Sequence, residues 1–108
     1  MIFIETPIFT RQIKTLVDDE VYGHFQGTLA ENPDAGDLIK GTGGLRKIRM
    51  ALPGRGKSGG ARVIYYYAQN AAQIRLLLAY EKSEQDDLTD EQRKARRHGG
   101  SHGDRIAP

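Results

Sequence analysis

The spacing of apolar residues changes at Leu45, and this change constrains the fold more than any other feature of the chain. Before Leu45, apolar side chains recur every three to four residues, as they do on one face of a helix. From Leu45 onward they alternate every two residues, as they do on a β-strand. The chain is therefore predicted to join a helical first half to a sheet-forming second half. Its 108 residues suit one α+β domain.

Two helices are expected after a short N-terminal strand over Ile2–Ile4. Thr6 is a suitable cap for the first helix, with Pro7 at its first position, and Asp18 is a suitable cap for the second. Each helix carries one apolar face at helical spacing. These faces consist of Phe9, Ile13, Leu16 and Val17 in the first helix and Tyr22, Phe25 and Leu29 in the second.

Three further strands are expected over Leu45–Leu52, Ala61–Ala68 and Ile74–Tyr80, and Thr89 begins a short helix over residues 90–97. The predicted order is β-α-α-β-β-β followed by that helix. In this arrangement two antiparallel helices pack on a mainly antiparallel sheet of four strands. Residues 1–97 form the single domain, and residues 98–108, which lack periodicity, are predicted to be a disordered tail.

Positive charge is concentrated in the middle of the chain. Residues 38–80 contain eight Lys and Arg side chains and no Asp or Glu, whereas residues 1–37 contain two basic and seven acidic side chains. Such a segment predicts contact with a polyanion. Alternation along Leu45–Leu52 puts Lys47 and Arg49 on one face and Arg46 on the other. The simpler interpretation is that these cations only solvate an exposed sheet face.

A glycine-rich loop connects the first two strands of the predicted meander. Its sequence ALPGRGKS, over residues 51–58, fits the loose phosphate-loop pattern, but a strand rather than a helix follows, so a nucleotide is not expected. Four glycines in residues 53–60 let the backbone approach a ligand closely, and Arg55 and Lys57 add two cations. The loop is therefore predicted to close over a phosphodiester backbone. The alternative is an ordinary hairpin connection.

The positions of Tyr66 and of the three histidines indicate which kinds of ligand to expect. Tyr66 shares a strand face with Arg62, so it is expected either to stack on a base or to pack in the core. His24 lies in the helical region, and His98 and His102 lie in the tail, so no histidine pair has metal-ligand spacing. Neither a metal nor a cofactor is expected.

The chain also has no cysteine, which excludes a disulfide framework and fits a reducing cytosol. No apolar run approaches the roughly 20 residues that a membrane span needs. A cytoplasmic protein without membrane contacts is therefore expected.

The segments GTGGLRKIRMALPGRGKSGGARVIYYY, at residues 41–67, and LLLAYEKSEQDDLTDEQRK, at residues 76–94, resemble the RelE/HigB superfamily of toxins, most closely its HigB-type branch. The likeness extends over residues 2–97. It implies the RelE-like fold and a ribosome-dependent mRNA endonuclease that cuts in the A site and inhibits translation. The implied partners are the ribosome with its mRNA and a small helix-turn-helix antitoxin.

The resemblance also implies site residues. The strand motif of alternating cations corresponds to Lys47 and Arg49, the arginine of the next strand to Arg62, and the lysine after the last strand to Lys82. Attack by the ribose 2′-OH on the adjacent phosphate then needs a base, charge stabilisation and an acid. We expect Lys57 or Lys47 to be the base, Arg49 and Arg62 to stabilise the phosphorane, and Lys82 to be the acid or a further cation. The residues expected to contact RNA are Arg46, Arg55, Tyr66 and Arg75.

The chain departs from the RelE pattern at Ser83 and Thr89, where an arginine and a catalytic tyrosine would stand. Catalysis would therefore rest on lysine and arginine. The departure keeps open a second interpretation, in which the chain is a non-catalytic RNA- or ribosome-binding module or an inactive toxin homologue. A scaffold that binds only a protein is a third, which leaves the uncompensated cations unexplained.

Overall fold

The structure, a computed structural model, describes residues 1–54, 60–85, 88–93 and 103–107. It is an α+β fold in which a short N-terminal strand, β1 (Ile2–Glu5), precedes α1 (Pro7–Leu16) and α2 (Asp19–Glu31). Next come β2 (Asp37–Leu38), β3 (Leu45–Met50), β4 (Ala61–Ala68) and β5 (Gln73–Glu81), with a 3-10 turn, η1 (Gln69–Ala71), between the last two. Residues 90–93 are helical, and β6 (Arg105–Ile106) is the last strand.

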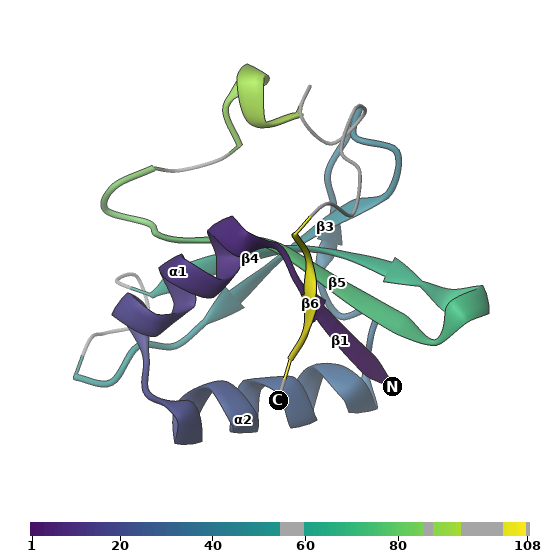
Figure 1. The fold of residues 1–108 in the computed structure, drawn as a ribbon. Helices are drawn as coiled ribbons and strands as arrows, with labels where there is room; N and C mark the ends of the chain where they lie inside the picture. Colours follow the sequence, from purple (N-terminus) through teal and green to yellow (C-terminus); the bar gives the residue numbers. More distant parts are fainter. Residues whose placement is uncertain (55–59, 86–87, 94–102, 108) are drawn as a thin grey trace.

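Both helices begin where their capping residues predict. Thr6 accepts a hydrogen bond from the backbone N–H of Phe9, with Pro7 in the first turn of α1, and Asp18 accepts one from Val21 at the start of α2. Figure 1 shows α2 running back in the opposite direction to α1, as the sequence predicts.

The strands form one mixed sheet in the order β2-β3-β4-β5-β1-β6. β1 runs parallel to β5, and every other neighbouring pair is antiparallel. The expected sheet of four strands is therefore correct in its centre and extended by a short strand at each edge. β2 and β6 have two residues each, too few to leave a periodic signal in the sequence.

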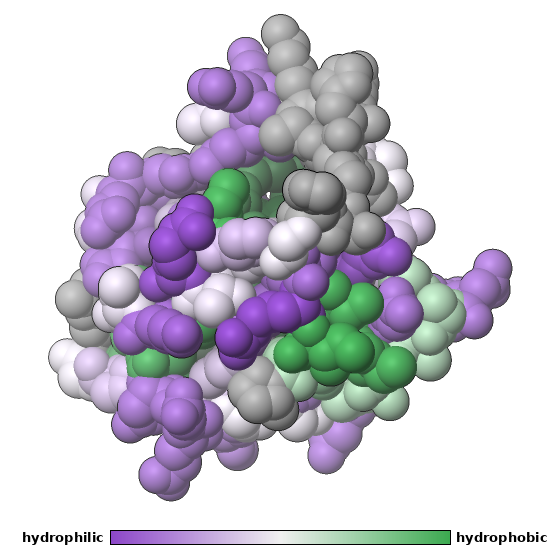
Figure 2. Space-filling view, viewed as in Figure 1, coloured by the Kyte–Doolittle hydropathy of each residue, from purple (hydrophilic) through white to green (hydrophobic). Residues whose placement is uncertain are grey.

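β6 also departs from the expected disordered tail, since it lies within residues 98–108. It pairs with β1, and the side chain of Arg105 lies 3.4 Å from the carboxylate of Glu5. Glu5 is 1% exposed and accepts hydrogen bonds from the hydroxyls of Thr10 and Tyr22, each at 2.6 Å. A buried carboxylate needs a charged or hydrogen-bonding partner, and Arg105 of β6 is one such partner of Glu5. This ion pair holds β6 against the sheet. Figure 2 shows an apolar patch over β1 and β6, where Ile2 and Ile106 are exposed.

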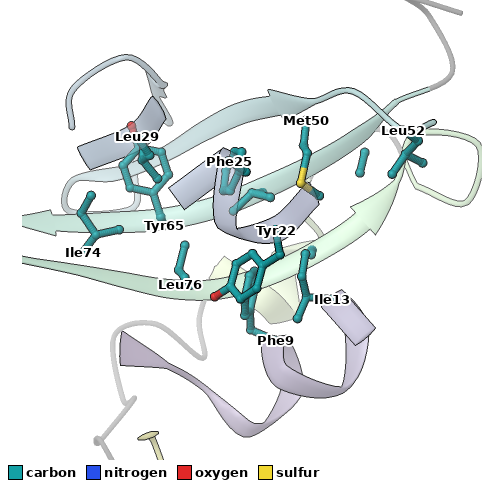
Figure 3. Close-up of a cluster of buried hydrophobic side chains, with 13 residues drawn as sticks. Phe9, Ile13, Tyr22, Phe25, Leu29, Met50, Leu52, Tyr65, Ile74 and Leu76 are labelled. Carbon is teal, nitrogen blue, oxygen red and sulfur yellow. The ribbon is translucent and has the colours of Figure 1, made fainter. Parts of the chain in front are cut away.

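The main core lies between the helices and one face of the sheet. Figure 3 shows Phe9 and Ile13 of α1 against Tyr22 of α2, and the rings of Phe9 and Tyr22 are 5.9 Å apart between centroids. The buried residues of the helices are those of the predicted apolar faces except Leu16 and Val17, which are partly buried. The helices thus cover one face of the sheet and do not contact the other.

Candidate functional site

The sheet face opposite α1 and α2, called here the open face, carries four of the six cations that the structure describes in residues 38–80. Its apolar centre is a second, smaller cluster that includes Leu45, Ile64 and Tyr80. Residues two positions along a strand share a face. The cations of the open face include Lys47 and Arg49 of β3, Arg62 of β4 and Arg75 of β5, and Tyr66 of β4 lies on the same face.

Arg49 and Arg62 lie directly opposite each other on neighbouring strands, and Arg62 in turn lies opposite Tyr80. Like charges directly opposite in an antiparallel pair destabilise a sheet. Within the described ranges, no ion pair joins either arginine to a carboxylate. The sheet thus holds two adjacent cations that no carboxylate in the described part of the chain pairs with.

Gly60 brings a third cation to the same end of the sheet. Its carbonyl accepts a hydrogen bond from the backbone N–H of Lys82 at 3.2 Å, which holds position 82 beside the start of β4. A Cβ atom at Gly60 would lie 3.4 Å from Nε of Arg49 and 2.8 Å from the carbonyl oxygen of Met50. Arg49, Arg62 and the backbone at Lys82 therefore gather around one glycine that has no room for a side chain.

Tyr66 and Arg75 occupy the other end of the open face, opposite each other on β4 and β5. The half-buried Tyr66 ring packs on Gly44, whose φ is +114° and where a Cβ would lie 3.1 Å from the ring. Arg75 is half-buried and lies near Asp104 of the C-terminal segment. Burial raises the pKa of Asp104 above its ordinary value, and the positive charge of Arg75 opposes that rise. Arg75 is therefore partly compensated, whereas no carboxylate of the described residues pairs with Arg49 or Arg62.

The remaining expected site residues are placed differently. Lys47 lies two residues from Arg49, opposite Ile64, and is half-buried. Arg46 points to the helical side, where its guanidinium donates to the carbonyl oxygens of Asp34 and Gly36 at 3.1 and 2.7 Å. Arg46 therefore ties down the loop after α2 and does not join the cations of the open face. Arg55 and Lys57 lie outside the described residues.

Leu88, which follows β5, covers part of the apolar centre of the open face. Leu88 is 6% exposed and packs in the smaller apolar cluster, and Thr89 caps residues 90–93 by accepting from the N–H of Gln92. Figure 1 shows these residues on the opposite side of the sheet from α2. Ser83 donates to the carboxylate of Glu81. The two positions that depart from the RelE pattern thus have local structural contacts.

Three residues of the open face and its surroundings, Gly60, Asp104 and Leu88, were not singled out individually from the sequence. Gly60 had a visible signal, since it ends a glycine pair before a strong strand. Asp104 had none, because its segment has no periodicity, and Leu88 is a single apolar residue among polar neighbours. Each is recognisable only from the contacts that the fold creates.

The chemistry available at Arg49, Arg62 and Lys82 is that of fixed positive charge. Guanidinium groups bind phosphate oxygens with two parallel hydrogen bonds, and several of them together stabilise a phosphate whose charge increases. Among the described residues, no three His, Asp or Glu side chains are grouped to hold a metal ion. No described helix has the length and apolar composition needed to cross a membrane.

The chain was compared with models of known protein families. The family described as the RelE toxin of the RelE/RelB toxin–antitoxin system matches residues 8–106.

Proposed function

The protein belongs to the RelE toxin family, the match covering nearly the whole chain, and from this premise we propose that it is a ribosome-dependent mRNA endonuclease. Membership makes it a toxin of a toxin–antitoxin system, with an antitoxin as its partner. The observation that carries the proposed activity is the directly opposed pair of Arg49 and Arg62, which no carboxylate compensates among the described residues. A fold retains such a destabilising pair where it binds an anion.

The proposed reaction is metal-independent transfer within the RNA. The ribose 2′-OH loses its proton to a base and attacks the adjacent phosphorus. The bond from phosphorus to the 5′-oxygen breaks, that oxygen takes a proton from an acid, and a 2′,3′-cyclic phosphate remains. Arg49 and Arg62 stabilise the phosphorane, because their guanidinium donors hold the charge that develops on its oxygens. Lys82 is the acid or a further cation, and Lys47 or Lys57 is the base.

RNA contacts at the other end of the open face extend the proposal. Tyr66 would stack on a base, and Arg75 would add a cation beside it. Four residues separate Arg62 from Tyr66 along β4, which is about 13 Å at 3.3 Å per residue. A single RNA strand of two or three nucleotides spans that distance. Arg46 is left out of this path, since it binds backbone carbonyls on the helical side.

The ribosome supplies the remaining requirement, which is substrate geometry. A small basic face has few groups to force an RNA strand into line for 2′-OH attack, whereas a codon fixed in the A site is already positioned. We therefore propose cleavage on the ribosome and little cleavage of free RNA. The likeness of residues 41–94 to the HigB-type branch supports a helix-turn-helix antitoxin.

The test is cleavage of mRNA on translating ribosomes by the purified toxin. The wild-type protein is expected to produce fragments with 2′,3′-cyclic phosphate ends, and Arg62→Ala is expected to lower the rate by about 10²- to 10³-fold. Arg11→Ala, which removes an exposed cation from α1, is the matched control and should cut at the normal rate. Normal cutting by Arg62→Ala, or equal cutting of free RNA, would contradict the proposal.

The rival function is a non-catalytic module that binds the ribosome. It is favoured by the local roles of Ser83 and Thr89, which stand where RelE-like enzymes have catalytic groups. The same assay separates the two functions, because a pure binder stalls translation without producing cyclic-phosphate ends.

A further inference from the structure

β5 contains one residue more than its partner strand, and this irregularity sets which side chains reach the open face. Ile64 lies opposite Leu78 and Tyr65 lies opposite Leu76, so Leu77 has no counterpart on β4. We infer that Gln12 of α1, together with Thr6, fixes this bulge and is thereby a positioning residue for the cations of the open face. The consequence for cleavage rests on the proposed function, whereas the consequence for strand register does not.

The bulge changes the phase of β5. Leu76 and Ala79 are in the core under the helices, while Leu77, Leu78 and Tyr80 belong to the cluster of the open face. In a regular strand, Leu76, Leu78 and Tyr80 would share one face. Tyr80 would then point toward the helices, and the residues after it would change sides as well, because a one-residue slip moves every side chain to the other face. The bulge thus puts Tyr80 opposite Arg62 on the open face.

The bulge lies where β5 loses its neighbouring strand. β1 pairs with β5 only as far as Glu5 opposite Leu76, and the chain then turns into α1. The next backbone groups of β5 on that edge therefore need other partners. Thr6 and Gln12 provide them: the Thr6 hydroxyl donates to the carbonyl oxygen of Leu77 at 2.8 Å, and Oε1 of Gln12 accepts from the N–H of Ala79 at 2.8 Å.

These two contacts are made at Leu77, the extra residue, and at Ala79, so they lie on either side of Leu78. Thr6 is also the N-cap of α1, so the start of the helix and the carbonyl at Leu77 are held by the same side chain. Gln12 lies six residues beyond Thr6, about 1.7 turns along the helix at 3.6 residues per turn, and reaches the same strand. Bulges often adjoin functional sites because they re-aim side chains. Here the helix on one side of the sheet determines the geometry on the other side.

Gln12 is the better residue to substitute, because a change at Thr6 would also remove the N-cap of α1. Gln12→Leu keeps the approximate size but leaves the N–H of Ala79 without its acceptor, and Gln12→Glu restores an acceptor oxygen. Ile13→Val is the matched control, because it loosens the packing of α1 on the core without touching a hydrogen bond to β5. Each full-length variant is examined by NMR for cross-strand contacts between Arg62 and Tyr80, and by cleavage on translating ribosomes.

Gln12→Leu is expected to weaken the contacts between Arg62 and Tyr80 and to lower kcat at least about tenfold with KM unchanged, because small misplacements of catalytic groups are costly. Gln12→Glu should recover both the contacts and kcat. Ile13→Val should keep both, even if its melting temperature falls as much as that of Gln12→Leu. Unchanged contacts or unchanged kcat in Gln12→Leu would overturn the inference.

Two further measurements test the inference if Gln12→Leu does not fold or if the wild-type protein does not cleave mRNA. If Gln12→Leu does not fold, hydrogen exchange of the unmodified protein decides: the amide of Ala79 should be as protected as that of Leu76, and exchange at the rate of an exposed loop would refute its bond to Gln12. If the wild-type protein cuts no mRNA, the proposed function fails. The NMR contacts still report whether Gln12 fixes the register.

Discussion

Replacing Arg49 with glutamine should raise stability and lower activity at once. Arg49 is exposed and lies directly opposite Arg62, so the two guanidinium groups repel each other without a carboxylate from the described chain to offset them. A cross-strand pair contributes about 0.2–1 kcal/mol, and solvent screening keeps the value low in that range. Arg49→Gln should therefore raise the free energy of unfolding by about 0.5 kcal/mol. For a domain of this size that corresponds to an increase of about 2–4 °C in Tm.

The same substitution removes a donor from the proposed phosphorane site. Loss of one such donor typically costs about 10²- to 10³-fold in rate. The two effects have opposite signs, which is the expected behaviour of a residue kept for function at the expense of the fold. A residue that only solvates the sheet would change neither quantity by much.

The measurements are thermal unfolding at low and high salt and cleavage on translating ribosomes. The gain in Tm should shrink at high salt, because salt screens repulsion between exposed charges. Arg11→Gln on the exposed side of α1 is the control and should leave both Tm and cleavage rate close to wild type. A lower Tm together with an unchanged cleavage rate in Arg49→Gln would refute the reasoning.

Three other substitutions test the surroundings of the open face. Tyr65→Phe removes the hydroxyl that holds the loop at Gly36 and should cost about 1–3 kcal/mol in chemical denaturation. Because burial raises the pKa of Tyr65 above 10.0, its contribution is complete below that pH and is lost as pH rises further, so wild-type Tm should fall more steeply than that of Tyr65→Phe in alkaline buffer. Glu5→Gln leaves one acceptor oxygen for the hydroxyls of Thr10 and Tyr22 and should cost about 1–3 kcal/mol, with full retention of Tm counting against the role of this carboxylate. Asp104→Asn removes the carboxylate near Arg75 and should raise affinity for single-stranded RNA by up to about fivefold in a binding titration, whereas a weaker affinity would show that this arginine does not face the RNA.

The sequence predicts the regular elements because their signals are local. Helical spacing and the caps at Thr6 and Asp18 place both helices, and alternation after Leu45 places the three central strands. β6 could not be predicted, because a two-residue strand forms only through its pairing with β1 and the contact between Arg105 and Glu5. Its stability is a property of the tertiary structure.

The candidate site was predictable in part for the same reason. Alternation alone puts Lys47 and Arg49 on one face, and the register then brings Arg62 opposite Arg49. Alternation likewise puts Arg46 on the other side, where it binds loop carbonyls. The bulge at Leu77 has no sequence signal, since it depends on side chains of α1 that lie some 70 residues away along the chain. Prediction from sequence therefore stops where distant segments decide a register.

The most direct test of the central claim is to map where RNA touches the protein. A short single-stranded RNA blocked by 2′-O-methyl groups can be titrated at low salt into isotope-labelled protein and followed by NMR. We predict shifted signals on the open face, at Arg49, Arg62 and Tyr66, and unchanged signals on the outer faces of α1 and α2. Shifts confined to the helices, with the three open-face residues unaffected, would contradict it.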